Sequence, residues 1–161
     1  MKKYIVALLI VGLFLSACSI RQEITPSTEQ IETDEICIVD NPAVRNGFLE
    51  AMQKTLVERG YKPKVFSKND KALDDCKYNI IYTANWKWDL ALYMAYAKID
   101  VIHNNRVVAA ALYDSNHGGA NPKKWVKGDN KVSELISQML PLKNGAQPQV
   151  QEKTAENAQA K

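Results

Sequence analysis

Two histidines are the first candidates for chemistry in this sequence. His117 lies in the run 114–119 (DSNHGG), so a serine, a histidine and an acid, either Asp114 or the more distant Asp89, are available for a hydrolase. A catalytic triad needs a serine hydroxyl hydrogen-bonded to the imidazole, and residues this close in sequence do not easily reach that geometry. No GxSxG elbow accompanies them. We therefore predict a glycine-rich turn at His117 and a solvated strand end at His103.

The sequence lacks the residue spacings that bind metals and cofactors. Its His, Cys, Asp and Glu residues do not recur at the intervals of a metal site, and no glycine-rich loop resembles a phosphate cradle. We expect no metal, no cofactor and no enzymatic activity, with an envelope hydrolase that uses His117 and its neighbours as the alternative. The net charge of +3 is too small to predict a nucleic-acid partner.

The N-terminus has the organisation of an export signal. A cationic start precedes the apolar run 5–15, which is shorter than the roughly 20 residues of a membrane-spanning helix. Residues 15–18 (LSAC) then resemble the lipobox of bacterial lipoproteins, in which the chain is cut before a cysteine that receives a diacylglyceryl group. We predict that residues 1–17 are a lipoprotein signal peptide and that Cys18 carries diacylglyceryl and palmitate-type chains. An ordinary secretory signal with a chance cysteine is the alternative.

The residue after Cys18 bears on which membrane holds the protein. In enteric bacteria an aspartate at that position favours retention in the inner membrane, and this chain has Ser19. We therefore expect a lipid anchor on the periplasmic face of the outer membrane, with exposure on the cell surface as the alternative. Two or more acyl chains give durable anchoring, because each buried methylene contributes roughly 0.8 kcal/mol.

The other two cysteines form an even pair in an exported chain. Disulfides persist in oxidising compartments, so we predict a Cys37–Cys76 bond. Closing a loop of about 40 residues would stabilise the fold by roughly 4 kcal/mol on the chain-entropy model. A buried thiol at Cys37 and a free thiol at Cys76 are the alternative.

Composition divides the rest of the chain into three parts. Residues 18–35 contain few large apolar residues and several acids, which predicts a flexible acidic tether after the acylated cysteine. Residues 143–161 are polar and rich in Gln and Ala, which predicts a disordered tail. The folded periplasmic domain is expected to span 36–142.

Within that domain, the pattern predicts two helices and five strands. Asn41 and Pro42 are expected to open the first helix, whose apolar stripe recurs every four residues, and Gly60 to close it. Asn104 and Asn105 suit a type I′ hairpin turn. The expected strands are 36–40, 62–66, 78–88, 90–103 and 106–113, and the second helix spans at least 129–140. The predicted fold class is α+β, a β-α-β-β-β-β-α domain with a mixed sheet, an antiparallel meander and two helices on one face.

An aromatic group gathers in the predicted second hairpin. Trp86, Trp88, Tyr93 and Tyr96 lie near Asp89, and aromatics beside a carboxylate stack on sugars or form interface hot spots. The alternation along 78–88 favours Trp86 and Trp88 as core residues. A binding surface formed by Trp88, Asp89 and Tyr93 is the functional interpretation.

Several runs also resemble a known family. Residues 36–42 (ICIVDNP), residues 82–94 (YTANWKWDLALYM) and Tyr113-Asp114 followed by Gly118-Gly119 are similar to an uncharacterised family of small Gram-negative lipoproteins, the Sbal-type family lipoproteins. The resemblance covers about 36–141 and implies no activity or site. The domain order is similar in outline to that of lipoproteins that assist outer-membrane assembly.

These observations favour a non-enzymatic envelope lipoprotein. We expect it to bind the membrane through its lipid and an envelope protein or glycan through its sheet face or the hairpin that carries Trp88 and Tyr93. A structural or stress-related lipoprotein without a single partner is a further possibility.

Overall fold

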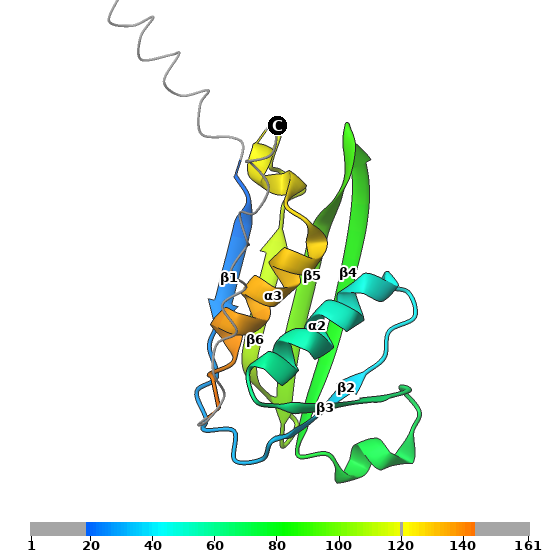
Figure 1. The fold of residues 1–161 in the computed structure, drawn as a ribbon, viewed down its shortest axis with the longest axis vertical. Coiled ribbons are helices and arrows are strands. Elements are labelled where there is room, and N and C mark those ends of the chain that lie inside the picture. Colours follow the sequence, from blue (N-terminus) through cyan, green and yellow to red (C-terminus); the bar gives the residue numbers. More distant parts are fainter. Residues whose placement is uncertain (1–18, 120, 144–161) are drawn as a thin grey trace, which may run out of the picture.

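Six strands form one mixed sheet, and two α-helices lie on one of its faces (Figure 1). The computed structural model describes residues 19–119 and 121–143. The predicted signal peptide, Cys18 and the predicted tail after Lys143 lie outside the described residues. Within the described part, no helix is long and apolar enough to cross a membrane.

The predicted α+β class and element order are confirmed, with one strand added at the start. The sheet order is β1-β6-β5-β4-β2-β3. Strand β2 is parallel to both of its neighbours, and the other pairs are antiparallel. The elements are β1 (Arg21–Thr25), β2 (Glu35–Val39), α2 (Asn46–Glu58), β3 (Lys62–Phe66), the 3-10 helix η1 (Lys71–Asp75), β4 (Tyr78–Asp89), β5 (Ala91–His103), β6 (Arg106–Asp114), the 3-10 helix η2 (Pro122–Trp125) and α3 (Gly128–Met139).

The strand register separates an apolar face from a mixed one. The rows under the helices are Ile80, Val101 and Ala109; then Tyr82, Ile99, Ala111 and Ile24; then Ala84, Ala97, Tyr113 and Gln22. Their members on β4, β5 and β6 are all buried. The rows on the opposite side, called the open face below, are Ile81, Asp100, Ala110 and Thr25; then Thr83, Lys98, Leu112 and Glu23; then Asn85, Tyr96, Asp114 and Arg21. Because side chains alternate along a strand, one register places the apolar set inward and the polar set outward.

Helix α2 begins four residues later than predicted for a Pro42 start. The Asn41 carboxamide instead accepts a hydrogen bond from the backbone of Ala43 and donates to the backbone carbonyl of Tyr82. Asn41 therefore makes a turn that ties the end of β2 to β4, and the helix starts only at Asn46. The expected apolar stripe holds, because Phe48, Met52 and Leu56 are buried.

The chain reversals follow the predicted turn chemistry. Gly60 has φ 85°, the left-handed conformation that ends a helix without steric cost in glycine. Asn104 and Asn105 have φ 49° and 60°, as a type I′ turn requires, and they join β5 to β6.

The predicted flexible tether is wrong for the described residues 19–35. Strand β1 pairs with β6 from Arg21 opposite Asp114 to Thr25 opposite Ala110. Ile31 is 2% exposed, and Glu29 binds the His103 ring at 2.8 Å. The segment is too polar to order itself, but β6 satisfies its backbone hydrogen bonds and Ile24 packs against the core. Low local hydrophobicity therefore does not indicate disorder here.

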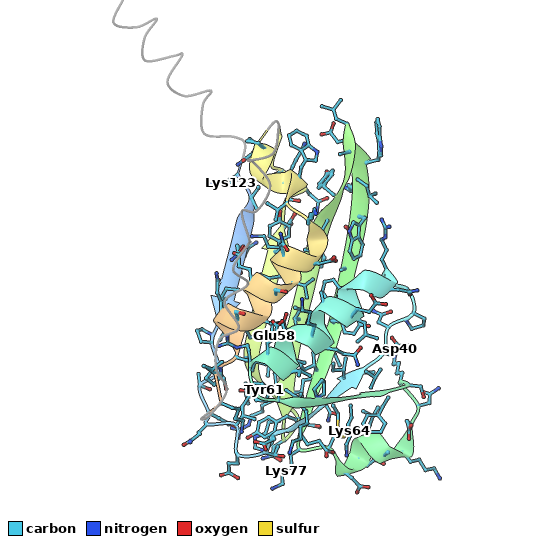
Figure 2. The ribbon with its side chains drawn as sticks, viewed as in Figure 1. Asp40, Glu58, Tyr61, Lys64, Lys77 and Lys123 are labelled. Atoms are coloured by element: carbon cyan, nitrogen blue, oxygen red, sulfur yellow. A yellow bond between two sulfur atoms is a disulfide. The ribbon has the colours of Figure 1, made fainter. Side chains whose placement is uncertain are left out.

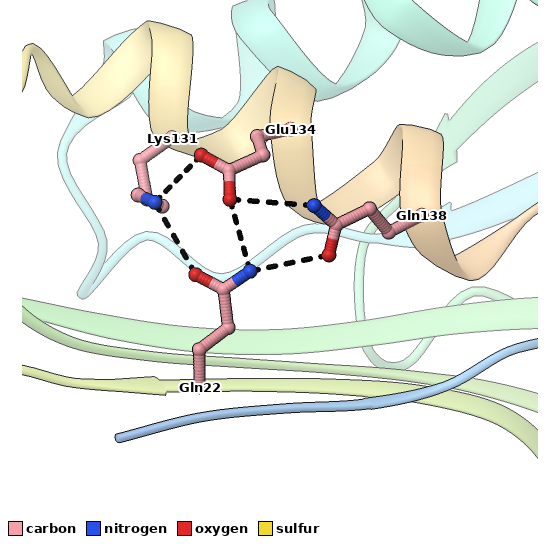
Figure 3. A network of polar contacts seen from close by, with 4 residues as sticks. All are labelled: Gln22, Lys131, Glu134 and Gln138. Atoms are coloured by element: carbon pink, nitrogen blue, oxygen red, sulfur yellow. Dashed lines mark hydrogen bonds and ion pairs between the residues drawn. The ribbon is translucent and has the colours of Figure 1, made fainter. Parts of the chain in front are cut away.

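A polar network joins β1 to α3 (Figure 3). The Gln22 amide donates to Glu134 at 2.9 Å and to Gln138 at 3.2 Å, while Lys131 donates to Glu134 at 2.6 Å and to Gln22 at 3.2 Å. Partial burial of Glu134 favours its neutral form, but the hydrogen bonds from Lys131, Gln22 and Gln138 outweigh it, so the pKa of Glu134 is lowered. The ionised carboxylate thus holds the added strand to the helix layer.

The network predicts a specific acid response. A carboxyl whose pKa is lower in the folded than in the unfolded chain stabilises the fold above the unfolded value, about 4.3 for Glu, and loses that contribution as pH falls through the folded value. We expect Glu134→Gln to lower the free energy of unfolding at pH 7 and to differ progressively less from the wild type toward pH 3. Urea unfolding at several pH values measures this, and a pH-independent difference would contradict the assignment.

The predicted Cys37–Cys76 disulfide is confirmed. It joins residues 39 apart in sequence, with their Cα atoms 6.2 Å apart. Cys37 lies in β2, and Cys76 lies just before β4. These two strands pair through only two residue positions, Cys37 with Asn79 and Ile38 with Ile80. The covalent bond therefore reinforces the junction between the β2–α2–β3 unit and the meander.

Loss of the bond should be measurable as lost stability. The double variant Cys37→Ala and Cys76→Ala should lower the free energy of unfolding by about 4 kcal/mol, because the unfolded chain regains the entropy of an open loop. Denaturant unfolding of oxidised protein measures the difference. Reduced wild type should match the variant closely, and a loss well under about 1 kcal/mol would show that the loop is constrained by other contacts.

Candidate functional site

The β4–β5 hairpin extends beyond the rest of the sheet (Figure 1). Strand β6 ends at Asp114, which pairs with Tyr96, so residues 91–95 of β5 continue past it. Strand β4 ends at Asp89, which pairs with Ala91, and only Leu90 lies between the two strands at the turn. In the view of Figure 1 this end of the hairpin stands above both helices.

Three large apolar side chains are exposed at the hairpin tip, defined here as residues 88–92. Trp88 is 74% exposed, Leu90 81% and Leu92 51%. Trp88 pairs with Leu92, so both side chains leave the same face of the hairpin. Leu90 has φ 59°, a left-handed conformation that costs a residue with a Cβ roughly 1–2 kcal/mol. A strained and exposed leucine at a turn favours a role in contact with another molecule.

The predicted core placement is wrong for Trp88 and holds in part for Trp86. Trp86 is half-buried and packs edge-on against Phe48 of α2, with ring centroids 6.2 Å apart. Trp88 lies on the same face two residues further along, where the helices no longer cover the strand. The side chains of β4 alternate as predicted, but the strand extends beyond the α-helices that cover its first part.

Of the three predicted binding residues, Trp88 and Asp89 are exposed and Tyr93 is not. Tyr93 is 7% exposed, so its predicted place on a binding surface is wrong. Asp89 binds Lys124, and the Asp89 backbone carbonyl accepts a hydrogen bond from the Trp125 indole at 2.9 Å. The carboxylate that was expected to face a ligand is therefore held by the protein's own loop.

Lys124 fixes the hairpin to the loop that follows β6. Its side chain is 4% exposed, and its ammonium binds the Asp89 carboxylate and the Gly119 carbonyl. The same ammonium lies 5.3 Å from the Tyr93 ring centre and 4.7 Å from that of Trp125. A buried lysine needs such compensation, because an ammonium removed from water is costly unless it is paired. The tip is thus braced at its base.

The loop after β6 also covers the free edge of β5. The Ser115 backbone donates to the Ala95 carbonyl at 2.9 Å, and its hydroxyl donates to the Met94 carbonyl at 3.0 Å. These bonds satisfy the part of β5 that β6 does not reach.

The same bonds occupy the groups considered for hydrolysis. Ser115 is 1% exposed and its hydroxyl is directed at β5, whereas His117 is exposed. Hydrogen bonds from the Asn116 backbone and side chain, together with the nearby His117 and Arg21, lower the pKa of Asp114 despite its partial burial. Serine and histidine are not arranged as a nucleophile and its base.

His103 is not the solvated strand end that we predicted. Its ring stacks on Tyr78 at 4.3 Å between centroids and contacts the Glu29 carboxylate. Both contacts are structural, since they hold the segment before β2 against the meander. In residues 19–119 and 121–143, no group of three His, Cys, Asp or Glu side chains could hold a metal ion.

Sequence reasoning missed two features of the tip. Leucine is rare in tight turns, so Leu90 between Asp89 and Ala91 was the available signal, but the pattern placed it inside a strand. Lys124 carries no local signal, because its burial depends on aromatic and acidic groups from β4 and β5.

Comparison with known proteins shows the fold alone. No family model matches the chain, and no curated protein matches it. Among solved structures, the chain is similar to a PelC dodecamer from Paraburkholderia phytofirmans, with a TM-score of 0.56 and 11% identity. The match covers 76% of this chain and 99% of that one.

Burial distinguishes Tyr93 from Trp88 in a direct test. Tyr93→Ala should lower the free energy of unfolding by about 3 kcal/mol, because it removes a buried ring and one partner of Lys124. Trp88→Ala should change it by less than about 1 kcal/mol, since an exposed side chain contributes little. Urea unfolding of both variants measures this, and equal losses would place Trp88 in the core after all.

Proposed function

We propose that the protein is a lipoprotein anchored through Cys18 to the periplasmic face of the outer membrane, where it acts as a non-enzymatic binding or assembly module. Lipid on Cys18 would hold the domain close to the membrane, because Arg21, three residues later, is already paired in the sheet. A segment of three residues spans at most about 10 Å. The anchor then sets the position of the domain relative to the membrane, as a long flexible tether would not.

The observation that carries the proposal is the open face of the sheet. Neither helix lies on it, and it combines charged, aromatic and aliphatic side chains in its three rows. Lys98 and Asp100 form an ion pair at 2.7 Å near its centre, and this bond and the nearby charge raise the pKa of Lys98. Ile81 opposite Asp100 is 40% exposed. Mixed surfaces of this composition suit contact with an envelope protein or a glycan.

Copies of the same chain are the first partner to consider. The similar solved structure is described as a dodecamer, and its whole length aligns with this domain. Edge pairing is a poor route to such an assembly here. The sheet has two edge strands, β3 (KPKVF) and β1 (RQEIT), and the proline of β3 and the charged residues of both oppose further strand addition. An assembly would therefore use a face rather than an edge of the sheet.

The proposal predicts a partner that depends on the open face. Tagged protein, crosslinked briefly and recovered from outer membranes, should bring down a defined partner, either another copy or a second protein, identified by mass spectrometry. Ile81→Arg should reduce recovery of the partner at least fivefold, because it replaces an apolar residue of the open face by a charged one. The fold should stay intact, because position 81 is exposed and the new guanidinium lies opposite Asp100.

Val57→Arg on α2 is the matched control, since Val57 is a branched aliphatic residue that is 60% exposed on the helix layer. It should recover the partner as the wild type does. Cys18→Ser should release the protein from the membrane fraction. Membrane association that survives Cys18→Ser, or a partner retained by Ile81→Arg, would contradict the corresponding half of the proposal.

A further inference from the structure

We propose that the hairpin tip is a second membrane contact, in which Trp88, Leu90 and Leu92 insert into the leaflet that holds the lipid on Cys18. The inference rests on the proposed acylation of Cys18. It assigns the apolar tip to lipid, and it leaves the open face for the protein or glycan partner.

The chain start and the hairpin lie at the same end of the molecule. Strand β1 begins there, beside the end of β6 (Figure 1). Ile20, two residues after the proposed anchor, packs against Gly118: a Cβ built on that glycine would lie 3.3 Å from Ile20 and 3.7 Å from the Lys124 side chain. Lys124 in turn binds Asp89 at the base of the tip. A continuous set of contacts thus connects the residue next to the lipid with the hairpin.

The lengths of the two segments also agree. The register shift between Asn85 and Trp86 leaves one extra residue in β5, so the hairpin extends about 13 Å beyond the row that contains Arg21, from Asn85 to Asp89 at roughly 3.3 Å per strand residue. Cys18 lies within about 10 Å of Arg21 along the chain. The tip can therefore reach at least as far as the anchor, so its apolar side chains can meet the boundary between headgroups and acyl chains where interfacial segments bury theirs.

The chemistry of the tip suits a lipid interface better than a dry protein pocket. Tryptophan and leucine favour the boundary between headgroups and acyl chains, where the indole keeps a polar partner. Cations lie at the same end of the molecule: Lys87, Lys123 and Lys127 are exposed and form no ion pair among the described residues. Figure 2 shows Lys123 at the tip end of the molecule and Lys64 and Lys77 at the other. The Asp89 charge is matched by Lys124, so the region favours anionic headgroups despite the exposed Asp129.

Leu90 adds an argument from strain. The left-handed conformation at φ 59° would suit asparagine or glycine better than leucine. An apolar side chain retained there, at 81% exposure, opposes both folding and solubility when the tip is in water. Insertion into a leaflet removes the exposure and gives the side chain a favourable environment.

The test uses the acylated full mature protein in vesicles of phosphatidylethanolamine and phosphatidylglycerol, with or without phosphatidylcholine brominated on its acyl chains. The chain has three tryptophans, so the Trp88 signal is the difference between wild type and Trp88→Phe. We expect the brominated lipid to lower that difference signal at least twofold. Leu90→Asn should restore at least half of the lost signal, without lowering stability, because asparagine accepts the turn conformation and removes the apolar contact.

The matched control is Val57→Asn, which replaces an exposed apolar residue near the end of α2 and should leave the quenching unchanged. If brominated lipid does not quench Trp88 in the acylated protein, this inference is wrong and the proposed function is unaffected. In that case, shielding of Trp88 from aqueous iodide identifies a second copy as its cover, and full access to iodide identifies a solvated tip. Absence of the diacylglyceryl mass on the purified protein refutes the proposed function as well.

Discussion

Pairing between β4 and β5 is the interaction on which the rest of the structure depends. These strands have 12 and 13 residues, whereas β6 has 9 and the remaining strands 5 each. The β5–β6–β1 side and the β4–β2–β3 side are both added to this pair. From Tyr78 to Asn85 the register is continuous and directs Ile80, Tyr82 and Ala84 toward the helices, and it shifts between Asn85 and Trp86. Because both α-helices are shorter than the pair, its far end has no α-helix above it. The alternation that builds the core under the helices therefore exposes apolar residues at this end.

Contacts along the edge of β5, rather than contacts with a covering α-helix, hold this projecting hairpin in place. The loop after β6 satisfies the free edge of β5 through Ser115, and Lys124 binds Asp89 while lying against the Tyr93 and Trp125 rings. A buried ammonium in this position is stable only with all its partners present, so the brace is cooperative. The hairpin is therefore a stiff extension, and the strain at Leu90 is concentrated at its end.

The N-terminal segment completes the domain in a way that matters for the proposed anchor. Strand β1 is held by backbone pairing with β6, by the Glu134 network and by Ile24 on the core. Further along, Glu29 and Ile31 hold the chain against His103 and the core. The proposed anchor at Cys18 would thus be only three residues from the sheet, and the fold would then set the orientation of the domain at a membrane.

Much of this architecture was accessible from the sequence because it depends on local rules. Period-two and period-four apolar patterns, turn residues such as Asn104-Asn105 and Gly60, and an even cysteine pair each predict structure within a short window. The class, the order of the later elements and the disulfide follow from them. Strand β1, the burial of Tyr93 and Lys124, and the exposure of Trp88 do not, since each depends on partners more than 20 residues away. Whether an alternating strand residue is core or surface is decided by what lies over it, and only the tertiary structure places the helices, the loop and the chain start relative to the end of the hairpin.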